Sequence, residues 1–161
     1  MLFCTQCFLE KDDVLPNVMS YAGNQLKMDG YYYQVTEWEE GLFIFNVHVF
    51  YRSGILLDVG GSNHFIEETD RRLMKDYVQD NWHKKNKYKW GVFFIDDNTI
   101  QINTLSQDYP HRLFVQEGVI LNDTTFKITT FSSGGKVKER DEIYYFREFS
   151  PKPDSTNVYI K

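Results

Sequence analysis

Hydrophobic and polar residues alternate along most of the chain after Gly30, which is the pattern of half-buried β-strands. In residues 42–52 every second position is apolar: Phe43, Phe45, Val47, Val49 and Tyr51. Alternation and the intervening turn residues predict further strands at residues 31–38, 55–59, 88–95, 99–105, 113–121, 124–131 and 141–149, with a short terminal strand at 158–160. His48 lies on the opposite face of its strand from the apolar residues, so we expect its side chain to be exposed.

One segment changes to a helical period. In residues 65–82, apolar and small residues recur every three to four positions, at Phe65, Thr69, Leu73 and Tyr77. Acidic residues lie near the start of this segment and Lys84 and Lys85 near its end, which is the charge order that a helix dipole favours. We therefore expect a single helix inserted between the third and fourth strands, with its acidic residues on a solvated face.

The strand order predicts the architecture. About eight strands joined by short turns form an antiparallel meander, and closing the meander removes both exposed edges. The sequence therefore predicts a mainly β, eight-stranded antiparallel barrel with one inserted helix around residues 65–82. The alternative is an α+β domain with the helix packed on a curved antiparallel sheet. Residues 1–29 have no clear period and are expected to form a loosely packed tail, so we place the single barrel domain at residues 30–161.

Composition supports the β assignment and limits the partners. Aromatic residues make up 17% of the chain, whereas alanine occurs once, at Ala22. The 18 Lys and Arg residues against 23 Asp and Glu give a formal charge of −5, which disfavours nucleic acids and anionic membranes. No apolar run is long enough for a transmembrane helix. The sequence also lacks a GxSxG motif, a P-loop and a GxGxxG motif, so we expect the protein not to be an enzyme.

The first residues of the chain carry both cysteines. Residues 1–9 are mostly apolar and contain Cys4 and Cys7, and residues 10–13 are charged. This order suggests the remnant of a lipoprotein signal, with Cys7 as the lipidation candidate, and the alternative is an unstructured start with two reduced thiols. The CxxC spacing can also bind zinc, but a zinc site needs two further ligands and the four histidines are scattered. No metal or cofactor is expected.

The barrel interior is the first place to seek a ligand, because small barrels either fill with side chains or hold one small molecule. The bulky residues expected to face inward are Phe43, Phe45, Tyr51, Trp90 and Phe94. Arg52, Arg147 and tyrosine hydroxyls are the candidate polar groups for orienting a ligand. Four other aromatic residues are expected on the outer faces of their strands: Tyr32, Phe50, Tyr144 and Phe146.

Residues 30–149 resemble a lipocalin-like (calycin) barrel. The matching features are the meander, the Lys89-Trp90-Gly91-Val92 strand start before the Asp96-Asp97-Asn98 turn, and Arg147 on the last strong strand. The chain is similar to small bacterial lipoproteins of this fold whose role is unassigned. The resemblance implies a barrel that holds a small apolar or amphipathic ligand, and an arginine packed on a tryptophan, with Arg147 and Trp38 in these positions. The lipocalin Gly-x-Trp motif is absent, since this chain has Gly30-Tyr31-Tyr32.

Two functions follow from these observations. The first is a non-catalytic binding protein of the cell envelope, periplasmic or on the outer membrane, with a small hydrophobic ligand and a lipid anchor. The second is a protein-interaction accessory module with a filled barrel, which would meet its partner through the loops at residues 107–112 or 150–157. A cytoplasmic location remains open under either reading.

Overall fold

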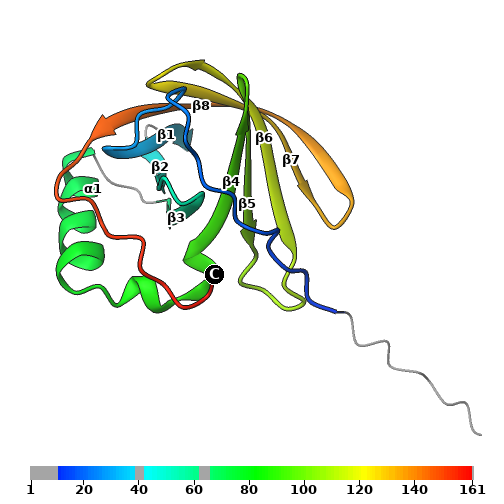
Figure 1. The fold of residues 1–161 in the computed structure, drawn as a ribbon, viewed down its shortest axis with the longest axis horizontal. Helices are drawn as coiled ribbons and strands as arrows, with labels where there is room; N and C mark the ends of the chain where they lie inside the picture. The colour runs from blue at the N-terminus through cyan, green and yellow to red at the C-terminus, as the bar shows by residue number, and fades with distance from the viewer. Residues whose placement is uncertain (1–10, 39–41, 62–65, 161) are drawn as a thin grey trace, which may run out of the picture.

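The computed structural model describes residues 11–38, 42–61 and 66–160. Within these residues the chain forms a closed antiparallel barrel, in which each strand pairs with the next and the last pairs with the first. Its eight strands are β1 (Gly30–Trp38), β2 (Leu42–Phe50), β3 (Ile55–Gly60), β4 (Trp90–Asp96), β5 (Thr99–Leu105), β6 (Leu113–Asn122), β7 (Thr125–Ser133) and β8 (Lys136–Glu148). The predicted meander barrel is confirmed, and the alternative of an open curved sheet is wrong (Figure 1).

Tight turns join several of the strands, and left-handed backbone occurs in the β2–β3, β4–β5 and β7–β8 turns. Gly54, between β2 and β3, has a φ of 84°, and Asp97, between β4 and β5, has a φ of 49°. A Cβ atom on Gly54 would lie 2.0 Å from the carbonyl oxygen of Met19. Glycine therefore meets two requirements at this turn, the positive φ and the close approach of the preceding segment.

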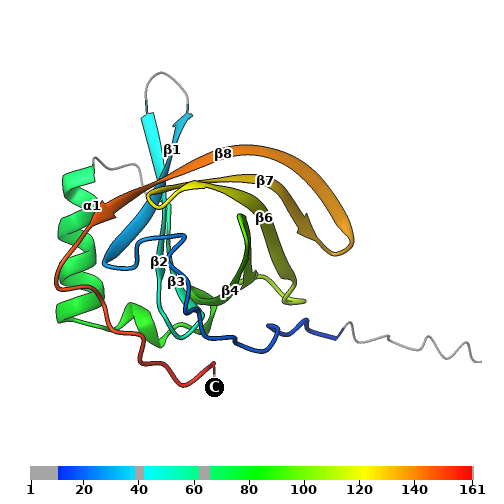
Figure 2. The same cartoon turned by 45° about the horizontal axis from the view of Figure 1, so that its top comes forward.

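The predicted helix is confirmed over most of its length. It consists of α1 (Ile66–Arg72) and a π-helical continuation, η1 (Leu73–Gln79), and is followed by two short 3-10 turns, η2 (His83–Lys85) and η3 (Lys87–Lys89). The buried residues Thr69, Leu73 and Tyr77 are spaced by four. In an α-helix, with about 3.6 residues per turn, residues four positions apart drift gradually around the helix axis. A π turn contains more residues, so residues at this spacing stay closer to one face. Figure 2 shows the helix along the outside of the barrel, beside β1, β2 and β3.

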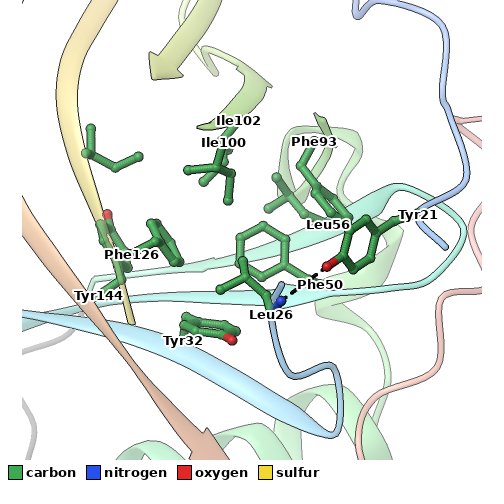
Figure 3. Packing of buried hydrophobic residues seen from close by; sticks show 11 residues of the cluster. Tyr21, Leu26, Tyr32, Phe50, Leu56, Phe93, Ile100, Ile102, Phe126 and Tyr144 are labelled. Atoms are coloured by element: carbon green, nitrogen blue, oxygen red, sulfur yellow. Dashed lines mark hydrogen bonds between the residues drawn. The ribbon is translucent and has the colours of Figure 1, made fainter. Parts of the chain in front are cut away.

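Two separate apolar clusters lie on the two sides of the barrel wall. The first fills part of the interior, with residues from seven of the strands and from the preceding segment: Tyr21, Leu26, Tyr32, Phe50, Leu56, Phe93, Ile100, Ile102, Phe126, Ile128 and Tyr144 (Figure 3). The rings of Phe50 and Phe93 meet edge to face with centroids 4.8 Å apart. Burying each such side chain contributes about 1.5–3 kcal/mol, so the interior cluster is a large part of the stability.

The second cluster lies between the outer face of β1–β4 and the helix. It contains Tyr31, Val47, Val49, Tyr51, Ile55, Leu57, Val59, Leu73, Tyr77 and Trp90. Strands covered on both faces are apolar on both faces, so alternation cannot tell inside from outside. For this reason the sequence-based assignment of faces is wrong for the residues that the structure describes. Tyr51 and Trp90 lie outside the barrel, and four residues expected outside lie within it: Tyr32, Phe50, Tyr144 and Phe146.

The segment before β1 packs against the barrel more closely than the sequence suggested. Leu26 is only 1% exposed, and Tyr21 donates its hydroxyl to Gln25 Oε1 and accepts a hydrogen bond from the Leu26 N–H. The Lys27 N–H donates to the carbonyl of Asp123, in the β6–β7 turn. Leu26 and Tyr21 thus cover the end of the barrel at which β1 begins. The division of the chain at residue 29 stays a prediction, but this segment shares the barrel's core.

The C-terminal segment crosses the outside of the barrel as a strap. Lys152 donates to the carbonyl oxygens of Met28 and Phe50, and its ammonium lies 4.5 Å from the centroid of the Tyr51 ring. Lys84 donates to Asp154 Oδ1 at 2.8 Å. The expected terminal strand at residues 158–160 does not form, and the N–H groups of Tyr159 and Ile160 donate to Asn157 Oδ1 instead of to a neighbouring strand.

Candidate functional site

A polar pocket of about 200 Å³ lies inside the barrel, toward the end at which β2 begins and β3 finishes. Its lining comes from five strands: Asn46 and His48 on β2, Asp58 and Gly60 on β3, Gln116 on β6, Phe131 on β7, and Arg140, Glu142 and Tyr144 on β8. The barrel interior therefore has two parts. The apolar cluster with Leu26 and Tyr21 occupies one, and the polar pocket occupies the other.

His48 is a buried polar residue of the pocket. Its side chain is 6% exposed, and neither ring nitrogen has a hydrogen-bond partner. The ring stacks on Tyr144 with centroids 5.3 Å apart and planes at 18°. Tyr144 in turn stacks on Phe126 at 4.8 Å. The expectation that His48 is exposed is wrong, because the face of β2 opposite Val47 and Val49 is the inside of the barrel rather than the solvent side.

The position of Asp58 relative to His48 determines the state of the imidazole. His48 Nδ1 lies 3.7 Å from Asp58 Oδ1, which is too long for a hydrogen bond. Burial lowers the pKa of His48, and the negative charge of Asp58 opposes this only in part. The imidazole is therefore neutral near pH 7, with one nitrogen as a donor and the other as an acceptor.

Asp58 is held by the backbone beside it. The Gly60 N–H donates to Asp58 Oδ1 at 2.8 Å, and the φ of 82° at Gly60 is a conformation that glycine adopts without strain. The Asp58 side chain is 30% exposed, so the carboxylate stays partly hydrated. This arrangement keeps a charged acceptor at the edge of the pocket, next to the buried imidazole.

The rest of the pocket wall is also polar. Asn46 Nδ2 donates to Gln34 Oε1 at 2.5 Å, and Gln116 Oε1 is buried without a hydrogen-bond partner. Arg140 Nε lies 3.7 Å from Glu142 Oε1, and its guanidinium lies 5.5 Å from the centroid of Phe131. With His48 neutral, the described residues of the lining hold two carboxylates and one guanidinium, so together they carry one net negative charge.

None of the sequence-predicted site residues with a described side chain lines this pocket. Tyr51 donates its hydroxyl to the Pro153 carbonyl, and Trp90 donates Nε1–H to the Lys84 carbonyl, each at 2.8 Å and outside the barrel. Phe94 alternates with Phe93 and Ile95, which face the interior cluster, so it too lies on the outer face. These three residues are corrected from interior to exterior.

The arginine candidates also lie away from the pocket. Arg147 pairs with Asp70 of α1 on the outside of the barrel, Nη2 to Oδ2 at 2.6 Å, so it is not the interior residue that the sequence suggested. Arg52 donates to the Gly23 carbonyl near the opposite end of the barrel. The side chains of Phe43, Phe45 and Trp38 lie outside the part of the chain that the structure describes. Cys4 and Cys7 also lie outside it.

Sequence reasoning missed the residues that do form the pocket, although a signal was present. Asn46 and His48 are polar at alternate positions of β2, and Glu142 follows Arg140 in the same way on β8. A run of polar residues on one strand face indicates either solvent or a polar interior. Only the closure of the barrel distinguishes the two, because it places both runs around the same space.

Comparison with protein-family models, with curated proteins and with solved structures finds no match to this chain. Within the described residues, no cluster of three or more His, Cys, Asp or Glu side chains is arranged to hold a metal ion. None of the helices in that part of the chain is long and apolar enough to cross a membrane. The fold and the pocket are therefore the observations on which a function can be based.

Proposed function

We propose that the protein is a non-catalytic binding protein whose barrel takes a small ligand, or the polar end of an amphipathic ligand, in the pocket around His48. The observation that carries the proposal is the pair of unpartnered nitrogens on the buried His48 ring. A buried polar group without a partner costs about 1–3 kcal/mol. A ligand that forms a hydrogen bond with either nitrogen recovers part of that free energy.

The pocket suits binding better than catalysis. Its described lining contains no serine, threonine or cysteine to act as a nucleophile beside His48. The apolar half of the interior is filled by side chains such as Phe50, Phe126 and Ile128, each at most 1% exposed. A wholly apolar ligand buried in the centre of the barrel therefore has less support than a ligand bound at the polar end.

The lipocalin-like reading belongs to this proposal. An eight-stranded closed antiparallel meander is compatible with that fold, and ligand binding inside such a barrel is what the resemblance implies. A place in the cell envelope, with Cys7 as a lipidated residue, is part of the same proposal. Metabolic labelling with a palmitate analogue checks it: label on the wild type that is lost in Cys7→Ser supports an anchor, and an unlabelled wild type removes it.

Native mass spectrometry tests the binding function. The full chain is incubated with a lipid and metabolite extract of its source cells, and a discrete added mass that leaves on denaturation is expected. Gln116→Trp fills the pocket and should abolish the added mass. Gln101→Trp is the matched control, because Gln101 alternates with the inward-facing Ile100 and Ile102 and so lies on the outer face of β5. An unliganded wild type across several extracts overturns the proposal.

The alternative function, a protein-interaction module, is favoured by exposed apolar and aromatic residues at two places. The β7–β8 hairpin projects beyond the body of the barrel, and it carries Val137 with 69% of the side chain exposed (Figure 2). Tyr109, in the loop at residues 107–112, is also largely exposed. Cross-linking in source cells distinguishes this function: a partner captured through residue 137 in a protein without any bound small molecule would favour it.

A further inference from the structure

We propose that the group received by the pocket is a small organic cation, namely an ammonium on a compact, partly aromatic body. This inference rests on the proposed binding function and specifies the chemical class of its ligand.

The charged side chains of the pocket favour a cation over an anion. The carboxylates of Asp58 and Glu142 both line the pocket, and Arg140 is the one cation in the described lining. The Arg140 guanidinium already has partners, since it lies beside Glu142 and over the ring of Phe131. Lys89 approaches Gly60, but its ammonium donates to the Val59 carbonyl and does not line the pocket. An incoming anion would meet two carboxylates, whereas an incoming cation would neutralise the remaining negative charge.

The hydrogen-bonding groups of the pocket favour a ligand that donates. Acceptors predominate among the groups without a full set of partners: Gln116 Oε1, the carboxylate of Asp58 and one nitrogen of the neutral His48 ring. The remaining nitrogen of His48 is a donor. An ammonium group has three donors and no acceptor, so it complements this set better than a carboxylate or a phosphate, which can only accept.

The aromatic rings of the pocket also favour a cation. Tyr144 and Phe131 both line the pocket, and the Arg140 guanidinium over Phe131 shows that this ring already faces a cation. A cation within about 6 Å of an aromatic ring is attracted to its face, more strongly when it is desolvated. The same rings offer an apolar surface for the body of the ligand.

The size of the pocket limits the ligand. Its volume of about 200 Å³ equals that of about seven water molecules, at the ~30 Å³ that each molecule occupies in the liquid. The buried part of the ligand must therefore be compact.

Three probes of similar size and different charge test the inference: benzylamine, benzyl alcohol and benzoate. Each is titrated into the full chain at neutral pH, and binding is followed through the ring resonances of His48 in two-dimensional ¹H–¹⁵N spectra. Benzylamine is expected to shift these resonances and to bind at least about tenfold more tightly than benzyl alcohol, which corresponds to 1.4 kcal/mol. Benzoate is expected not to bind.

Matched charge variants separate the pocket from the overall charge of the protein. Asp58→Asn and Glu142→Gln should each weaken benzylamine binding about fivefold to tenfold. Asp141→Asn is the control, since Asp141 precedes Glu142 on β8 but is 79% exposed and pairs with Lys127 outside the pocket. It removes the same charge and should leave the affinity within twofold. Thermal unfolding of each variant confirms that it is folded.

Two results overturn the inference. One is that benzyl alcohol or benzoate binds as tightly as benzylamine, and the other is that none of the three probes shifts His48. Neither result by itself removes the proposed function, because a ligand mass found in the cell extract and lost in Gln116→Trp would still show binding of another class. Conversely, benzylamine binding that is unchanged in Asp58→Asn and Glu142→Gln shows that the carboxylates do not select the ligand.

Discussion

Arg147 on β8 donates hydrogen bonds to Asp70 on α1 from two guanidinium nitrogens. Nε lies 3.1 Å from both carboxylate oxygens, and Nη2 lies 2.6 Å from Oδ2. Tyr31 on β1 donates its hydroxyl to Asp70 Oδ1 at 2.7 Å. One carboxylate of the helix therefore connects to both strands at which the barrel closes. The packing of Arg147 on Trp38 that the resemblance implies stays a prediction, since the Trp38 side chain lies outside the described part of the chain.

Asp70→Asn should lower the free energy of unfolding by about 1–3 kcal/mol, because it removes the charge from a two-pronged, partly exposed pair. Urea unfolding followed by circular dichroism measures the change. The control is Asp76→Asn on η1, whose nearest contacts to Arg72 and His83 are 4.0 Å long, and which should cost less than about 0.5 kcal/mol. Equal losses in the two variants would contradict the role given to Asp70.

Leu26→Ala should cost about 2–5 kcal/mol, the range for large-to-small substitutions in a core, because Leu26 is 1% exposed and belongs to the interior cluster. The same measurement on Val14→Ala, at a residue that is 75% exposed, should show almost no change. If Leu26→Ala were as stable as the wild type, residues 11–29 would be a tail rather than part of the barrel domain.

The stability of the wild type should fall as the pH drops below about 6.5, the ordinary pKa of histidine. Burial lowers the pKa of His48 in the folded protein, so the unfolded chain binds the proton more readily. Protonation therefore favours unfolding, and the loss continues until the pH reaches the folded pKa. Asp58, which faces the ring at 3.7 Å, moderates the effect, and Glu142 and Arg140 line the same pocket.

His48→Gln removes this contribution. Urea unfolding of the wild type and the variant at several pH values between 4.5 and 7.5 isolates it, since the other titrating groups cancel in the difference. The variant should lose less stability than the wild type on acidification. Parallel curves would show that His48 does not titrate differently in the folded and unfolded states.

The sequence allowed the architecture to be predicted, because strand alternation and turn residues are local properties. The strand at residues 99–105 has the predicted bounds, and the described helix, from Ile66 to Gln79, falls within the predicted range of residues 65–82. The closed order of the strands followed from the shortness of the connections. These features do not depend on knowing what each strand face contacts.

The site could not be predicted in the same way, because it depends on what covers each face. Trp90 and Phe93 are both buried and lie three positions apart on β4, yet one packs outside against the helix region and the other faces the interior. His48 looked solvent-exposed for the same reason. The alternation of β2 was correct, but the side that holds Val47 and Val49 is covered by the helix, and the polar side is the interior.

Closure through β1 and β8 has a consequence for how the chain folds. Gly30 pairs with Glu148, so the contact that completes the ring joins residues from the first and last strands. Such non-local pairing gives a high contact order, and barrels of this kind fold in milliseconds to seconds. During synthesis, β1 would present an unpaired edge until β8 leaves the ribosome, whereas β2 pairs with both β1 and β3. The pairing of β8 with β1 is thus the step that closes the barrel of the newly made chain.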